Sequence, residues 1–150
     1  MLAKATRWLA SRSARTLIVA RRATLFIAGQ TGMVAVNADW NAAKFPATLQ
    51  RAIAEAPAIG TALIWLHDPE PALAWLLPVL PGARVVLVLG SVSEAPTLPT
   101  SAARIATVRL GSIATAHGRR WLSDDEISDG AIAALRDGRS RIVGELGPVG

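Results

Sequence analysis

The chain has no cysteine and no tyrosine among its 150 residues. Without cysteine it can form neither a disulfide nor a thiolate metal site, which fits the cytoplasm. Its longest apolar runs, Thr16–Ala20, Thr61–Leu66 and Val85–Leu89, are far shorter than the ~20 residues that span a bilayer. We therefore expect a cytoplasmic protein with no membrane partner.

Acidic residues are absent before Asp39, although six basic residues precede it. The formal charge is +5, but the basic residues are not clustered with aromatics as in nucleic-acid-binding proteins. Their spacing is closer to that of a solvated helix face, so no nucleic-acid partner is expected. An acid-free start is also typical of an organelle transit peptide, but the strand-like run 16–20 follows at once.

Apolar residues make up 51% of the chain and charged residues 18%, which predicts one domain over residues 1–150 with a sizeable core. Hydrophobic periodicity predicts helices over 2–11, 42–56, 69–77 and 123–138, and strands over 16–20, 33–36, 61–66, 84–89, 105–110 and 141–146. Residues 23–28 fit either element, and 91–101 fit a loop. Strands that alternate with helices predict parallel pairing, right-handed crossovers and an open α/β sheet with helices on both faces.

The last helix has the clearest boundaries. Ser123 and Glu126 have the spacing of a capping box, and Gly138 lies where a left-handed C-terminal cap belongs. Asp124, Asp125 and Glu126 are explained by this helix start, where negative charge is favourable. They have no partner at metal-ligand spacing, and neither do His67 and Asp68, so no metal site is expected.

Leu110 ends a predicted strand, Gly111 follows it, and Thr115 comes four residues after the glycine. With the helix and strand that come next, this last third of the sequence resembles the short-chain dehydrogenase/reductase family. Residues 108–115 are similar to the family's Pro-Gly-x-x-x-Thr turn after its sixth strand, with Leu110 in place of proline. Residues 121–135 resemble the next helix and 140–146 the closing strand. The resemblance implies a Rossmann-like sheet in which Gly111, the Ile113 main chain and Thr115 contact the nicotinamide half of the cofactor.

Residues further upstream resemble other strand ends of this family. Ser91 follows a strand, at the place of the serine that hydrogen-bonds the substrate carbonyl, while Asp39 and Trp40 lie where the family holds adenine. Arg21 and Arg22 follow the second strand of the family pattern. A guanidinium there can pair with the 2′-phosphate of NADP, so NADP is the expected cofactor. The alternative is that both arginines are simply solvated.

The family's opening strand and glycine-rich phosphate loop have no counterpart, and the first strand of the sheet is expected to be missing. Residues 29–32 hold two glycines but precede a strand-like run, which favours a turn over a phosphate loop. The strands 16–20 and 61–66 should then lack their shared neighbour, leaving main-chain groups unpaired. We expect either that Met1 is an internal methionine of a longer reading frame or that the sheet of a shortened protein has rearranged or associated.

The family's catalytic tyrosine and the lysine four residues later are also absent, since position 104 is arginine and the last lysine is Lys44. His67, at the end of a strand, and Ser91 are the remaining candidates for catalysis. The sequence favours a divergent short-chain dehydrogenase/reductase-like protein that binds NADP in intact form and, if it is an enzyme, is an atypical NADP-dependent oxidoreductase. The alternatives are a noncatalytic dinucleotide-binding or regulatory protein and a structural interaction protein. A homo-oligomer is expected.

Overall fold

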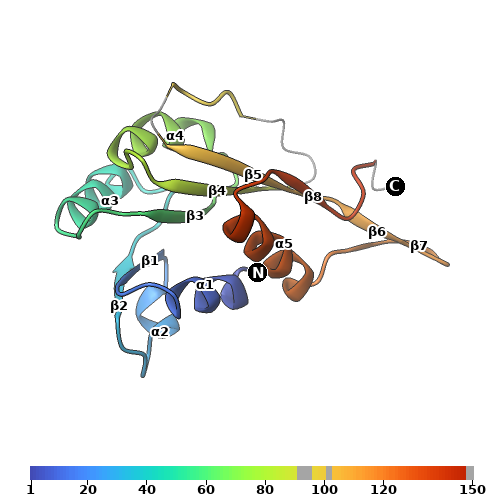
Figure 1. Ribbon diagram of the computed structural model, residues 1–150, viewed down its shortest axis with the longest axis horizontal. Helices are drawn as coiled ribbons and strands as arrows, with labels where there is room; N and C mark the ends of the chain where they lie inside the picture. The colour runs from blue at the N-terminus through green and yellow to red at the C-terminus, as the bar shows by residue number, and fades with distance from the viewer. Residues whose placement is uncertain (91–95, 101–102, 148–150) are drawn as a thin grey trace.

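The computed structural model describes residues 1–90, 96–100 and 103–147, which form helices and mostly parallel strands (Figure 1). The helices are α1 (Ala3–Ala10), α2 (Ala23–Phe26), α3 (Phe45–Ala54), α4 (Glu70–Leu76), the 3₁₀ turn η1 (Leu77–Val79) and α5 (Asp124–Asp137). The strands are β1 (Thr16–Ala20), β2 (Met33–Asn37), β3 (Thr61–Trp65), β4 (Arg84–Leu89), β5 (Arg104–Leu110), β6 (Ser112–Thr115), β7 (Gly118–Trp121) and β8 (Arg141–Val143).

The strands form three separate sheets. The main sheet is parallel and has the order β3-β4-β5-β8, a second parallel sheet contains β1 and β2, and β6 and β7 form an antiparallel hairpin. The register of the main sheet pairs Leu63 with Val86 and Val86 with Ala106. The predicted α/β class with a mostly parallel sheet is thus confirmed.

The core lies on both faces of β4, whose last five residues are at most 1% exposed. Val86 and Val88 pack on the face that α1 and α5 cover, whereas Val85, Leu87 and Leu89 pack on the face of α3 and α4 (Figure 1). This explains why β4 is a continuous apolar run instead of an alternating one. Within the described ranges, no helix is long and apolar enough to cross a membrane.

Helix α5 begins and ends as predicted. The Ser123 side chain accepts a hydrogen bond from the Glu126 N–H, and the Glu126 carboxylate accepts one from the Ser123 N–H at 2.8 Å. Gly138 ends the helix with a φ of 70°. Its buried face, which includes Ala131 and Leu135, covers the main sheet because the apolar residues recur at helical spacing.

The prediction that all crossovers are right-handed is wrong. The connections from β3 to β4 and from β5 to β8 both step in the same direction along the main sheet. Helix α4 of the first connection and α5 of the second lie on opposite faces, so the two crossovers have opposite hands. The second connection also contains the β6–β7 hairpin, which intervenes between β5 and α5.

Residues 23–28, which fitted either element, contain the short helix α2. Two boundaries differ from prediction. The helix after Pro69 continues beyond Pro78 as η1, because proline tolerates the first turn of a helix. The final strand ends at Val143 rather than 146. Gly144 then adopts a φ of 76°, and Glu145 turns to pair with Ser112 in an antiparallel bridge.

The sheet of β1 and β2 shares no strand pairing with the main sheet in the part of the chain that the structure describes. β1 pairs only with β2, and β3 pairs only with β4. The expectation that these two strands lack a common neighbour is therefore confirmed. Their burial reflects it, since Ile18 is the only buried residue of β1.

The Glu126 carboxylate should make α5 stability depend on pH. Two hydrogen bonds from Arg120, and then the Ser123 N–H, lower the pKa of Glu126 from 4.5 to about 2. A carboxyl with a lowered folded pKa stabilises the fold above its unfolded pKa, and that contribution disappears as the pH falls from about 4.5 towards 2. Glu126→Gln should therefore lower the urea concentration at the unfolding midpoint at pH 7. The difference in midpoint between this variant and the wild type should become smaller below pH 4.5.

Glu55→Gln is the matched control, because Glu55 is exposed and forms no ion pair with any described residue. A gap of the same size and pH dependence in this control would contradict the assignment to the Arg120–Glu126 pair.

Candidate functional site

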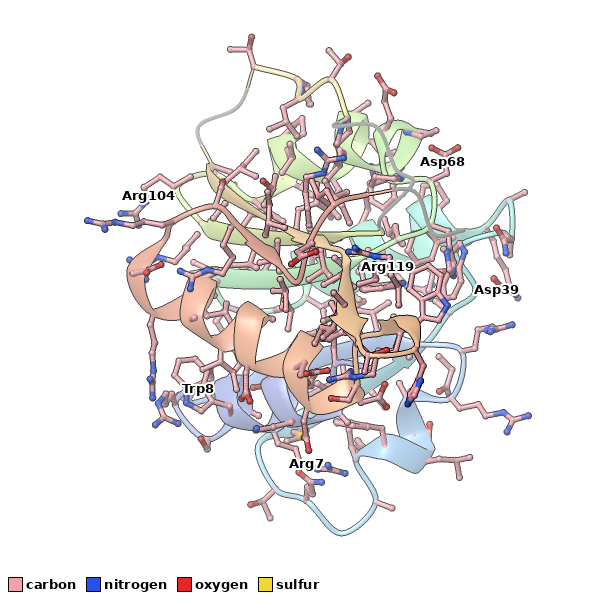
Figure 2. All side chains as sticks on the ribbon, turned by 90° about the vertical axis from the view of Figure 1, so that its right-hand side faces the viewer. Arg7, Trp8, Asp39, Asp68, Arg104 and Arg119 are labelled. Carbon is pink, nitrogen blue, oxygen red and sulfur yellow. The ribbon has the colours of Figure 1, made fainter. Side chains whose placement is uncertain are left out.

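The loops at the carboxyl ends of β1, β2 and β3 bring together several predicted site residues. Arg21 and Arg22 follow β1, Asp39 and Trp40 follow β2, and His67 follows β3. Parallel strands place these loops at one edge, which is where open α/β sheets bind ligands. Figure 2 views the molecule towards the side where Asp39 and Asp68 project from two of these loops.

Trp40 is at the centre of this group. The Arg21 guanidinium lies over the Trp40 ring at 5.2 Å from its centroid, and the centroids of the His67 and Trp40 rings are 6.0 Å apart. His67 also meets Trp65 edge-on, with centroids 6.3 Å apart. We call Arg21, Trp40, Trp65 and His67 the Trp40 cluster. A cation over a tryptophan face is worth about 0.5–1 kcal/mol at an exposed site, so Trp40 orients the Arg21 side chain.

Arg21 and Arg22 are both exposed, and neither side chain forms an ion pair or hydrogen bond with another described residue. Their guanidinium donors are therefore available to an anion. The Arg21 guanidinium lies over an aromatic face, and its N–H groups donate to no described residue. Two adjacent arginines at the end of one strand form a site of positive charge next to an aromatic surface.

Asn37 and Thr24 fix the loop that carries Arg22. The Asn37 side chain accepts a hydrogen bond from the Thr24 N–H at 3.1 Å and donates one to its hydroxyl at 2.6 Å. These bonds join the end of β2 to the start of α2, directly after Arg22. Neither residue was singled out from the sequence. A polar residue at a strand end was the available signal, together with threonine immediately after the arginine pair.

Asp39 precedes Trp40 in the chain and accepts hydrogen bonds from its own turn. Its carboxylate accepts the N–H of Asn41 at 3.0 Å, and its carbonyl accepts the N–H of Ala42 at 3.0 Å. These bonds shape the turn that leads into α3. Asp39 therefore orients Trp40 through the main chain, and its half-buried carboxylate still borders the cluster.

Of the two predicted catalytic residues, His67 is the one in the described part of the chain. His67 is exposed, and its ring contacts there are Trp40 and Trp65. Ser91 lies outside the described residues. No three His, Asp or Glu side chains gather as metal ligands within residues 1–90, 96–100 and 103–147.

Gly111, Ile113 and Thr115 lie in the segment from the end of β5 through β6. The sequence predicted a turn here, whereas the structure has a β-hairpin. The Thr115 hydroxyl donates to the Gly118 carbonyl at 3.1 Å and accepts the His117 N–H at 3.3 Å, which closes that hairpin. Thr115 is exposed and Ile113 half-buried.

Gly111 has a packing reason to be glycine. It is buried, and its N–H donates to the Val143 carbonyl at 2.8 Å. A Cβ at this position would overlap the main chain of Glu145. The close approach lets Ser112 and Glu145 exchange two main-chain hydrogen bonds, of 3.1 and 2.9 Å, which join the hairpin to the end of β8.

Arg119 reinforces the same junction from β7, near the centre of the view in Figure 2. Its Nε donates to the buried Ser112 hydroxyl at 2.7 Å, and one terminal nitrogen pairs with the Glu145 carboxylate at 3.2 Å. Sequence reasoning missed this network because its members are distant in the chain and only the hairpin brings them together.

Comparisons with protein-family models, with curated proteins and with solved structures found no match.

Replacing Gly111 with alanine should destabilise the fold by about 1–3 kcal/mol, because the added methyl group overpacks against the Glu145 main chain. Gly147→Ala is the control, since no atom lies within 4 Å of a Cβ built there. Urea unfolding should show the loss in the first variant alone. Equal stability of the Gly111→Ala and Gly147→Ala variants would show that contact with the Glu145 main chain does not require glycine at position 111.

Proposed function

We propose that the protein is a divergent, Rossmann-like member of the short-chain dehydrogenase/reductase type that binds NADP at the carboxyl ends of β1 and β2. The observation that carries the proposal is the placement of Arg21 on the face of Trp40, with Arg22 beside it and both guanidinium groups without described polar partners. A cationic pair next to an aromatic ring matches a ligand that joins a phosphate to a base.

The 2′-phosphate is the part of NADP that this arrangement fits best. A guanidinium offers two parallel donors to phosphate oxygens, and such charge-assisted pairs are about twice as strong as neutral hydrogen bonds. A carboxylate directly after β1 would instead favour the free ribose hydroxyl of NAD. Because Arg21 and Arg22 occupy both positions after β1, we expect selection for the phosphorylated cofactor.

Trp40 and Asp39 supply the neighbouring surface for adenine. Trp40 is half-buried and contacts both Arg21 and His67, so its orientation is set before any ligand arrives. The Asn37–Thr24 bonds hold the Arg22 loop in the same way. When bound, NADP supplies hydride chemistry, while these residues bind and orient its adenosine end.

The residues favour a protein that binds NADP without catalysing the family's oxidoreductase reaction. The sequence contains no tyrosine to move a proton and no lysine after Lys44 to lower such a group's pKa. A dinucleotide-binding protein with a regulatory role needs neither group. It needs only the surface that Arg21, Arg22 and Trp40 provide.

Isothermal titration with adenosine 2′,5′-bisphosphate and adenosine 5′-monophosphate tests this site, because the two ligands differ in the 2′-phosphate alone. We expect tighter binding of the bisphosphate, and a loss of about 1–3 kcal/mol for it in Arg21→Ala and Arg22→Ala. Arg15→Ala, just before the amino end of the same strand, should change nothing. Equal affinities for the two ligands, or an equal loss in Arg15→Ala, would overturn the proposal.

An atypical oxidoreductase is the second candidate, and the position of His67 favours it. The imidazole lies against Trp40 at the proposed cofactor edge, and histidine is the side chain that most often serves as a general acid in enzymes. In this alternative His67 gives a proton to the oxygen of a carbonyl substrate as that carbonyl is reduced.

Steady NADPH consumption with a panel of aldehydes and ketones would support the enzyme. We expect any such activity to fall at least about 100-fold in His67→Ala, as for loss of a general acid. His117→Ala, at the exposed tip of the hairpin, should keep the full rate. Unchanged turnover in His67→Ala would exclude the histidine as proton donor, and the binding proposal would stand on its own titration.

A further inference from the structure

The strands β1 and β3 border a cleft of about 930 Å³, which we call the β1–β3 cleft. All five residues of each strand line it. Helix α1 contributes Leu9 on one side, and α3 contributes Leu49 and Ile53 on the other. The cleft thus separates the β1–β2 sheet from the main sheet over the full length of both strands.

Both walls of the cleft present unpaired strand edges. Among described residues, β1 hydrogen-bonds as a strand only to β2, and β3 only to β4. Each strand therefore turns a row of N–H and C=O groups towards the cleft, and such edges favour addition of another strand. The Thr16 hydroxyl, also on the wall, is buried without a hydrogen-bond partner.

The two edges run in the same direction. At their carboxyl ends, Arg21 after β1 and His67 after β3 both contact the Trp40 ring. At their amino ends, Arg15 and Gly60 line the same cleft. A single strand between them could therefore pair in parallel on both sides and join the two sheets in the order β2-β1-strand-β3-β4-β5-β8.

The cleft has the size of one short strand. A five-residue strand rises ~3.3 Å per residue and occupies ~4.8 Å between neighbours in a layer ~10 Å thick, or roughly 800 Å³. The cleft is slightly larger, at about 930 Å³. Because β1 and β3 each have five residues, an inserted strand of that length would match both edges.

The lining indicates what the strand must be made of. Side chains on one face of the strand would meet Leu9, and those on the other would meet Phe45, Leu49 and Ile53. A parallel strand covered on both faces is a continuous apolar run rich in Val, Ile and Leu. The charged lining residues Arg15, Arg51 and Glu55 belong to segments at the amino ends of the strands, so they border only one end of the cleft.

We propose that the β1–β3 cleft binds an extended apolar segment of about five residues, from polypeptide outside residues 1–150, as a strand parallel to β1 and β3. The strand-length apolar runs in the described chain already belong to strands paired in its sheets or to helices, so a second copy has none of these to donate without unfolding. This inference rests on the unpaired edges and the volume, and it is independent of NADP binding.

A fluorescein-labelled peptide, Lys-Lys-Val-Ile-Val-Leu-Val-Lys-Lys, tests the proposal on the chain as it is. We expect saturable binding at one peptide per chain. The amides of β1 and β3 that face the cleft donate no hydrogen bond within the sheets. At a free peptide concentration ten times Kd, hydrogen exchange at these amides should slow about tenfold. The same peptide with proline at its central valine lacks an N–H donor and should bind at least tenfold more weakly.

Two variants of α3 provide a matched pair. Ala52 lines the cleft and is half-buried, whereas Ala47 is exposed on the same helix and does not line it. Ala52→Arg should weaken peptide binding at least tenfold, and Ala47→Arg should leave it unchanged. Circular dichroism checks that both variants fold. If Ala52→Arg does not fold, the proline peptide with the wild-type chain still tests strand pairing.

Three results would overturn the proposal. The first is no binding of the apolar peptide, and the second is equal binding of the proline peptide. The third is a chain that sediments as a dimer and already protects the β1 and β3 cleft-side amides without peptide, which would assign the cleft to a second copy.

Discussion

The rest of the structure depends on the burial of β4 on both faces. Five consecutive apolar residues of this strand lose nearly all contact with solvent, and such burial is tolerated only where neighbouring strands satisfy the main-chain groups. β3 and β5 provide that pairing, and α4 and α5 cover the two faces. The carboxyl ends of the parallel strands then meet at one edge, where Arg21, Trp40 and His67 come into contact.

At β1 and β3, neighbouring described strands do not satisfy the main-chain hydrogen-bonding groups on both sides. Their pairing partners lie on one side only among the described residues, and the opposite sides border an apolar cleft. Main-chain groups there must bond to water while apolar side chains around them favour its exclusion. The proposed nucleotide site and the proposed strand site are thus neighbours, because Trp40 belongs to the first and also lines the cleft.

Several features of the fold could be predicted because short-range physics decides them. The start and end of α5 follow from Ser123, Glu126 and Gly138, whose hydrogen bonds and backbone angle involve neighbours within a few residues. The limits of β1 and β4 follow from apolar runs bounded by polar residues. The hairpin of β6 and β7 was missed because Arg119 and Arg120 do not alternate with apolar residues. It is joined to β8 through Arg119 and Glu145, which are far apart in the chain.

The sequence by itself determined the α/β class, the carboxyl ends of β1, β4 and β5, and the arginine pair after β1, because periodicity, caps and turn residues act locally. Only the tertiary structure decided that Arg21 stacks on Trp40, that Gly111 admits the Glu145 main chain, and that one crossover has the opposite hand. It also placed the unpaired edges of β1 and β3 on the two sides of one cleft. These outcomes depend on contacts between distant segments, whose geometry is fixed only when both faces of β4 are covered.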